Sequence, residues 1–176
     1  MASHVFTATA SIPISAAPEK VFALLTDRST WPVWNTFIPL ADLVSPAPIS
    51  ASPDDGKIQV GQKLHFHVRA KVFGKLRAVP GGSGEEVNIL STPADAAGER
   101  GIWRVGWKAA DMPAWLFRAQ RVNEVLAEEG GGCTYRTDET FDGPLAYLVK
   151  VLSGWLVREG LVMWAEGLKK EAEKGN

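Results

Sequence analysis

Alternating apolar and polar residues define most of the strands predicted for this chain. From His4 to Ser15 the β-branched residues recur at nearly every second position, which predicts a first strand. At 63–70 the alternation is cleaner, with apolar residues on one face and His65 and His67 on the other. Further strands are expected at 86–92, 101–109, 117–127 and 133–141.

Helical segments lie before and after this run of strands. Pro18 and Glu19 open a short helix, because a first-turn proline loses no hydrogen bond and an acidic side chain suits the positive helix end. A second short helical or looped piece is expected at 27–39, followed by a proline- and aspartate-rich connection at 46–56. A helix of about 30 residues is predicted from Gly143 to about Lys174.

This order of elements predicts a single α+β domain over residues 1–176. We expect a curved antiparallel sheet of about six to seven strands wrapped around one long C-terminal helix, with two short helices after the first strand. A curved sheet covered by one helix tends to leave space between the two layers. An apolar space of this kind is the default site for a small molecule.

Composition and charge exclude several classes of protein. The 176 residues are 45% hydrophobic, and 19 basic against 20 acidic residues give a net charge of −1, so a strongly basic nucleic-acid module is not expected. The apolar stretch at 145–165 is interrupted by Lys150, Arg158 and Glu159, which predicts a soluble helix rather than a membrane span. A single cysteine and no secretory signal favour a cytoplasmic protein.

Seven tryptophans and seven phenylalanines make the chain rich in large aromatic residues. Trp103 and Trp107 share one face of a predicted strand, and the long helix carries an apolar stripe that includes Leu152, Trp155 and Met163. Core packing and ligand contact both account for these side chains. Gly154 and Gly160 in the helix allow two interpretations as well, close packing on the sheet or room for a ligand.

Polar residues on the last two strands are the strongest chemical candidates. Antiparallel pairing places Glu139 opposite either Arg121 or Asn123. If these side chains and Tyr135 face the cavity, they form a polar anchor for a ligand or an acid–base pair. If they face solvent, they form a weak surface pair. A slip of one residue in the register would exchange the two faces.

Other possible sites are weaker. His65 and His67 have the spacing of metal ligands, but the only other histidine is His4, so neither a metal nor a cofactor is expected. Cys133 has no histidine close to it in the sequence and is expected to be an inert strand residue. The glycine-rich segment at 80–84 precedes a strand and predicts a turn, not a phosphate-binding loop.

Two segments carry a family resemblance. VFALLTDRSTWPVWN at 21–35 and ETFDGPLAYLVK at 139–150, together with the element order, resemble the SRPBCC superfamily of START-like, helix-grip proteins. Within it the chain looks most like the polyketide cyclase/dehydrase type, through Leu25-Thr26-Asp27 and the Trp-x-x-Trp-Asn segment that ends at Asn35. The resemblance implies an apolar ligand between the sheet and the long helix, and it does not imply a reaction.

We therefore expect a protein that binds a lipid, polyketide or aromatic metabolite in an internal cavity. One alternative is a polyketide cyclase or dehydratase that uses Arg121, Glu139 and Tyr135. A second is a partner-binding or lipid-delivery module with an exposed apolar patch around Leu161, Val162 and Trp164; no oligomeric state is predicted. The expected ligand-binding residues are Trp34, Phe66, Trp103, Trp107, Arg121, Asn123, Tyr135, Glu139, Leu152, Trp155 and Met163.

Overall fold

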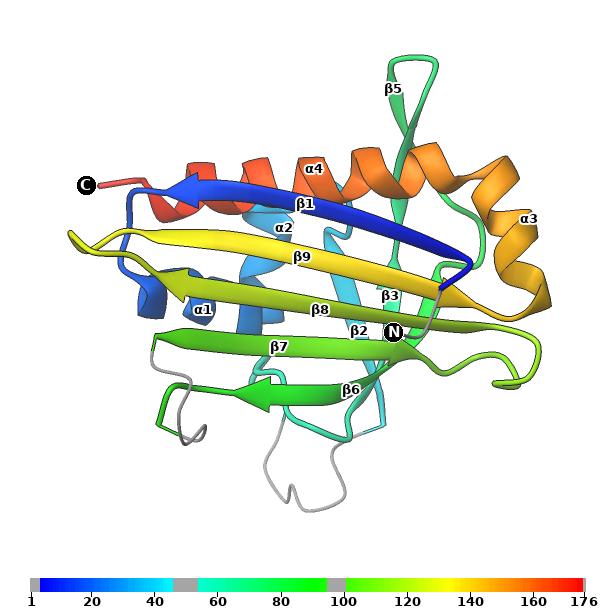
Figure 1. Cartoon of the computed structure of the whole chain (residues 1–176), viewed down its shortest axis with the longest axis horizontal. Helices are drawn as coiled ribbons and strands as arrows, with labels where there is room; N and C mark the ends of the chain where they lie inside the picture. Colours follow the sequence, from blue (N-terminus) through cyan, green and yellow to red (C-terminus); the bar gives the residue numbers. More distant parts are fainter. Residues whose placement is uncertain (1–3, 46–53, 95–100, 176) are drawn as a thin grey trace.

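A computed structural model of the chain describes residues 4–45, 54–94 and 101–175. A seven-stranded antiparallel sheet, in the order β1-β9-β8-β7-β6-β3-β2, packs against the long helix α4 (Figure 1). The elements are β1 (Phe6–Ile14), α1 (Pro18–Thr26), a 3-10 turn (Arg28–Thr30), α2 (Trp31–Trp34), β2 (Leu40–Ser45), β3 (Lys63–His67), β4 (Arg69–Val72), β5 (Lys75–Ala78), β6 (Ser83–Ser91), β7 (Ile102–Ala109), β8 (Arg118–Ala127), β9 (Cys133–Asp142), α3 (Pro144–Leu152) and α4 (Gly154–Ala172).

The predicted α+β architecture, with two short helices after the first strand, is confirmed. The alternation of apolar and polar residues produces the layered architecture, because β1 buries Phe6, Ala8 and Ala10 against the helix layer while the residues between them are exposed. We call this the inner face of the sheet and the opposite side the outer face. Most of the connection expected at 46–56 lies outside the described residues.

The predicted long C-terminal helix is confirmed as α4, but the stretch predicted as one helix from Gly143 is divided into two helices. α3 ends at Leu152, Ser153 leaves helical geometry with φ −137° and ψ 2°, and α4 begins at Gly154 (Figure 1). The Ser153 hydroxyl donates to the Val149 carbonyl at 3.1 Å, the local bond by which serine competes with a continuing helix. Leu152 and Trp155 beside this break are 64% and 53% exposed, so they do not line the interior.

The predicted strand at 63–70 divides at Val68, and a separate hairpin follows. β4 and β5 pair only with each other and project beyond α4 (Figure 1). Phe73 and Gly74 form the turn with positive φ angles of 50° and 75°, a geometry that glycine adopts readily and phenylalanine rarely. The predicted turn around Pro80 is confirmed, but β6 begins at Ser83, three residues before the expected start.

Aromatic rings fill the interior where α2 and α4 meet the sheet. The ring centroids of Trp31 and Trp164 are 5.0 Å apart and those of Trp34 and Trp164 are 5.3 Å apart, both in edge-to-face geometry. Trp164 and Leu161 are fully buried, so the exposed patch predicted around them does not exist; within that patch Val162 is exposed.

Close packing accounts for one of the two helix glycines. A Cβ added at Gly160 would lie 2.3 Å from the Phe37 ring, so the glycine lets α4 approach this aromatic side chain. A Cβ at Gly154 would meet only the end of the Phe6 ring, at 3.3 Å. The interpretation of Gly160 as room for a ligand is therefore wrong.

Candidate functional site

A cavity of about 220 Å³, partly open to solvent, lies between the inner face of the sheet, α4 and the segment that connects β7 to β8; we call it the inner cavity. Its wall is largely apolar, and three carboxyl groups interrupt it. The residues that line it are Phe37, Val68, Gly82, Ser83, Gly84, Glu85, Ala109, Asp111, Met112, Phe117, Ala119, Glu139, Phe141 and Val157.

Two of the carboxyl groups come from inner-face strand positions. Glu85 on β6 is only 9% exposed, and Glu139 on β9 is part-buried with its side chain in the cavity wall. The third, Asp111, follows β7 at an exposed position and accepts a hydrogen bond from the Gly84 backbone N–H. A Cβ at Gly84 would overlap the Asp111 carboxylate, so the absence of a side chain there permits the contact.

The protein environment favours the neutral forms of the two strand carboxyls. Burial raises the pKa of Glu85 to about 8, with a further contribution from the charge of Glu139, and a hydrogen bond from Ser83 and the charge of Arg121 oppose the shift. Burial also raises the pKa of Glu139, with Arg121 again opposing. Because its pKa lies above 7, Glu85 is mainly protonated at neutral pH and can donate a hydrogen bond into the cavity.

Arg121 supplies the positive charge that acts on both carboxyls. Arg121 lies directly opposite Glu139 on the neighbouring strand, which is one of the two registers predicted for Glu139. The Arg121 side chain is buried, with 2% of the residue exposed. Its Nε donates to Thr137 Oγ1 at 3.1 Å, and its guanidinium lies 4.3 Å from the Trp164 ring centroid and 5.5 Å from that of Trp107. Among the described residues its buried Nη2 has no hydrogen-bond partner.

Asn123 and Tyr135 also face inward, but they belong to the packed interior. The Tyr135 hydroxyl donates to Asn123 Oδ1 at 2.7 Å, and Asn123 Nδ2 donates to the Val105 carbonyl at 3.1 Å. Burial raises the pKa of Tyr135, so its hydroxyl stays protonated. Their polar groups satisfy each other, and neither residue is part of the cavity wall.

The predicted ligand-binding residues are thus distributed over several places. Glu139 lines the cavity, whereas Phe66 and Trp107 are packed against each other at 5.3 Å and Trp103 is partly buried against the core. Trp34 and Met163 line a different hollow between α2 and α4. Leu152 and Trp155 are on the surface, because the break at Ser153 ends the predicted stripe.

Of the residues that line the cavity only Glu139 was predicted, and the buried carboxyl of Glu85 was not. The strand was predicted to begin at Glu86, so its neighbour was left in the preceding turn. Val87 is fully buried, and a strand that extends two residues back from an inward valine must also point Glu85 inward. That alternation was the available signal.

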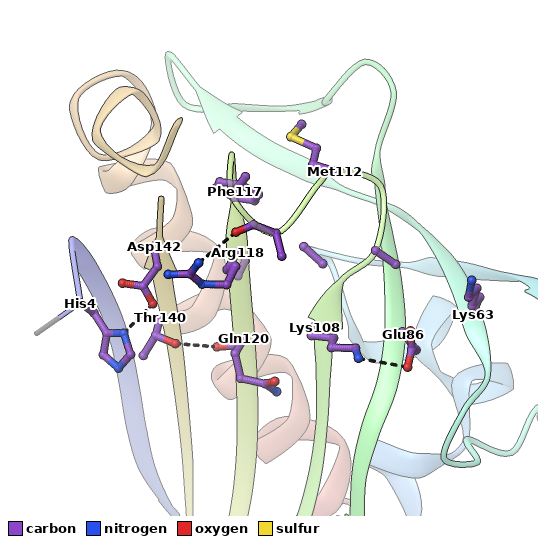
Figure 2. Close-up of a pocket in the computed structure, with 14 residues that line it drawn as sticks. His4, Lys63, Glu86, Lys108, Met112, Phe117, Arg118, Gln120, Thr140 and Asp142 are labelled. Atoms are coloured by element: carbon purple, nitrogen blue, oxygen red, sulfur yellow. Dashed lines mark hydrogen bonds and ion pairs between the residues drawn. The ribbon is translucent and has the colours of Figure 1, made fainter. Parts of the chain in front are cut away.

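A larger hollow of about 590 Å³ lies on the outer face, away from the helices (Figure 2). Four of its charged residues form two pairs: His4 Nδ1 is 2.8 Å from Asp142 Oδ2, and Lys108 Nζ is 3.2 Å from Glu86 Oε1. Exposed pairs of this kind are satisfied by each other and by water and need no ligand. The inner cavity, with its buried carboxyls, is therefore the better candidate site.

The histidines and the cysteine do not form a catalytic or metal centre in the described parts of the chain. His67 is exposed, and its Nε2 lies 2.7 Å from Asp42 Oδ2 on the outer face. Within residues 4–45, 54–94 and 101–175, no three His, Cys, Asp or Glu side chains are arranged to hold a metal ion. Cys133 is buried, and burial raises the pKa of its thiol to about 11.

Solved structures share this fold. The chain superimposes with a TM-score of 0.64 on the Zhui aromatase/cyclase from a Streptomyces species, at 11% identity, covering 96% of this chain and 94% of that one. A START superfamily protein from Mycobacterium smegmatis gives 0.61 at 13% identity, with 99% and 100% covered. Norcoclaurine synthase from Thalictrum flavum, solved with a transition-state analogue, gives 0.63 at 12% identity, with 98% and 97% covered.

The sheet and the helix layer that covers it define a helix-grip fold, which the chain shares with the START superfamily protein and the aromatase/cyclase. The chain is 30% identical over 162 residues to the oxopyrrolidines biosynthesis cluster protein O of Penicillium oxalicum, covering 84% of this chain and 77% of that protein. It belongs to the same family as that fungal protein. No family model matches the sequence.

Proposed function

We propose that the protein binds an apolar small molecule in the inner cavity and holds one polar group of that molecule at Glu85 and Glu139. The observation that carries the proposal is an apolar cavity between sheet and helix whose wall contains these two carboxyls. The shared fold with a START protein and an aromatase/cyclase supports it. A cytoplasmic location and the absence of nucleic-acid binding stay predictions.

The volume of the cavity and its carboxyl groups restrict the kinds of ligand that can bind there. About 220 Å³ is below the range of about 300–1,000 Å³ usual for drug-sized ligands, which favours a small metabolite or one end of a longer molecule. A protonated Glu85 donates to a ligand carbonyl, and the other carboxyl oxygens accept from a hydroxyl or N–H group. The name of the fungal relative places that protein in a biosynthesis cluster for oxopyrrolidines, compounds that carry such groups.

Calorimetric titration with an oxopyrrolidine, an aromatic polyketide, a fatty acid and a sterol tests the proposal. We expect saturable binding of at least one ligand, at least tenfold weaker in Ser83→Leu, because Ser83 lines the inner cavity and not the outer hollow and leucine would fill the cavity. Ala114→Leu is the matched control, since Ala114 lines the outer hollow and does not line the inner cavity. Loss of binding in Ala114→Leu but not in Ser83→Leu would place the site on the outer face and overturn the proposal.

A second candidate function is acid–base catalysis in the same cavity. It is favoured by the pKa of about 8 for Glu85 next to a second carboxyl, since a catalytic acid works best when its pKa lies near the working pH. Of the residues predicted for this role, Glu139 lines the cavity, Arg121 acts through its charge, and Tyr135 is held by Asn123.

Turnover of a ligand identified by calorimetry separates the two functions. As a catalyst, Glu85→Gln would lower kcat at least a hundredfold while ligand affinity changes little, because glutamine keeps the shape and cannot transfer the proton. Unchanged turnover in Glu85→Gln would exclude the carboxyl from catalysis. Binding without any turnover by the unmodified protein would leave the carrier function alone.

A further inference from the structure

The β4–β5 hairpin is a basic and apolar projection on a chain of net charge −1. Its ten residues, 69–78, include two arginines and two lysines and no acidic residue. Phe73 at its tip is 96% exposed and Leu76 is 44% exposed, while all four residues of β5 are exposed. An aromatic ring so fully in contact with water contributes nothing to the core, so the fold does not account for it.

A second exposed apolar surface lies on the C-terminal helices. The end of α3 and the start of α4 present five large side chains to solvent, with Lys150 exposed among them. Isolated exposed apolar residues are common, but five within nine positions form a patch. We call them the junction residues: Tyr147, Leu148, Val151, Leu152 and Trp155, which are 63%, 52%, 77%, 64% and 53% exposed.

The hairpin and the junction residues are neighbours. Lys71 on β4 lies 3.7 Å from Glu159 on α4, measured from Nζ to Oε1. Trp155 precedes Glu159 by four residues and therefore shares its helix face, one turn nearer to α3. Figure 1 shows the hairpin rising past α4 on the same half of the molecule as α3. Aromatic, aliphatic and cationic side chains are thus gathered on one end of the protein.

This end also holds the inner cavity. Val68 and Gly82, which flank the hairpin in sequence, line the cavity on one side, and Val157, two residues after Trp155, lines it on the other. The surface that carries the exposed apolar residues therefore borders the space in which we place the ligand.

We propose that the hairpin and the junction residues dock the protein on the surface of an anionic lipid bilayer. Phe73, Tyr147 and Trp155 enter the headgroup region, where aromatic rings are favoured, and the hairpin cations contact lipid phosphates. Charge complementarity selects this partner, because the hairpin has four cations, of which only Lys71 is placed against an acidic residue of α4, and no acidic residue of its own. The apolar residues between the cations have no role on a nucleic acid.

The attachment is peripheral. None of the described helices is long and apolar enough to cross a membrane. Docking would bring the cavity next to the bilayer, so that an apolar ligand passes between them with little exposure to water. The docking itself needs no cavity ligand, and its test is separate from that of the proposed function.

Vesicle co-sedimentation of the full chain tests the docking. We expect binding to phosphatidylcholine vesicles that contain phosphatidylserine, weak binding to phosphatidylcholine alone, and a loss of binding at high salt. Lys75→Gln and Arg77→Gln should each weaken binding to the anionic vesicles about fivefold, the effect of one basic charge at the membrane surface. Equal binding to both vesicle types, or no binding to either, overturns the proposal.

The apolar contribution is tested at the hairpin tip. Phe73→Asn should weaken anionic-vesicle binding at least fivefold without loss of fold, because asparagine tolerates the positive φ better than phenylalanine. Val33→Ser on α2 is the matched control, since Val33 is 69% exposed and distant in sequence from the patch, and it should bind as the unmodified protein does.

Two further results would count against the bilayer. Unchanged vesicle binding by a folded Phe73→Asn protein would exclude the tip, and tighter binding to duplex DNA than to vesicles would assign the cations to a nucleic acid. Ser83→Leu should keep its vesicle binding, because Ser83 lines the cavity and belongs neither to the hairpin nor to the junction residues. A failure of ligand binding with intact vesicle binding would thus reject the proposed function and leave the docking standing.

Discussion

The carboxyl of Glu85 combines deep burial, a neighbouring acidic group and a more distant arginine. Its pKa of about 8 in the folded protein compares with 4.5 for an unperturbed glutamate. Between these two pH values the folded state binds more protons than the unfolded chain does. The favourable contribution of this group is therefore fully present below pH 4.5 and is lost as the pH rises to about 8.

Replacing the carboxyl should remove this pH dependence. We expect Glu85→Gln to raise the melting temperature relative to the unmodified protein at alkaline pH, by an amount that corresponds to a few kcal/mol, and to have much less effect at acidic pH. Differential scanning calorimetry across this range measures the difference. Glu86→Gln on the outer face is the control. A Glu85→Gln effect that does not change with pH would contradict the raised pKa.

For the residues of the site, the strand pairing could be predicted from the sequence, but the contacts of the inward side chains could not. The pairing of Arg121 with Glu139 was predictable as one of two registers, because a short connection between β8 and β9 constrains which residues face each other. The inward position of Asn123 followed from the same alternation. Whether an inward side chain meets a cavity or another side chain depends on packing in three dimensions, and alternation along one strand contains no such information.

At the scale of elements, β7, β8 and β9 are joined by a buried polar chain. The Tyr135 hydroxyl on β9 donates to Asn123 on β8, which donates in turn to the Val105 carbonyl on β7. Each polar atom in this chain depends on the next for its hydrogen bond, since none of the three residues is exposed to water.

Breaking this chain at one end should destabilise the sheet. Tyr135→Phe leaves Asn123 Oδ1 buried without its donor, and we expect a loss of about 1–3 kcal/mol in the free energy of unfolding by urea. Asn123→Leu on the Tyr135→Phe background should cost less than the two single changes added together, because the orphaned acceptor is removed. Additive effects would show that the two side chains do not interact.

The C-terminal helices illustrate how an element can be predicted and still be misplaced. The helical period was correct on both sides of Ser153, and no proline interrupts the stretch after Pro144. The break arises from one serine hydroxyl bonded back to Val149 and an adjacent glycine, both of which continuous helices often tolerate. Its effect is large, because α3 is redirected and the predicted cavity residues Leu152 and Trp155 become surface residues.

At the scale of the whole molecule, stability is unevenly distributed. The strands β1, β9, β8 and β7 pair along almost their full lengths and bury their inner faces under the helix layer. The β4–β5 hairpin pairs only with itself and is mostly exposed. Regions with few buried apolar contacts open locally at low free energy, whereas the core opens only with global unfolding.

Amide hydrogen exchange should distinguish the stable central strands from the less stable β4–β5 hairpin. We expect the amides of β8 and β9 to exchange slowest and those at 69–78 to exchange faster by several orders of magnitude, as measured by mass spectrometry of peptic fragments. Binding to anionic vesicles should slow exchange in the hairpin and leave β8 and β9 unchanged. Strong protection of the hairpin in the free protein would contradict this distribution.

The overall architecture was the part most accessible from the sequence. The period of two, the late helical period and the segments at 21–35 and 139–150 together predicted a sheet that wraps a C-terminal helix, and the structure and its relatives agree. The β4–β5 hairpin was not predicted, because its exposed residues lack the one-sided burial that produces alternation. Strands that are exposed on both faces therefore show a weaker alternation of apolar and polar residues than strands that pack against a core.

The buried position of Cys133 makes the chain ready for site-specific labelling. A thiol with a pKa of about 11 and almost no exposure has very little thiolate to react with a maleimide near neutral pH. A second cysteine introduced at an exposed position, for example by Ala78→Cys, would react alone while the protein is folded. A fluorophore placed in this way would follow the hairpin on a membrane without removal of the native cysteine.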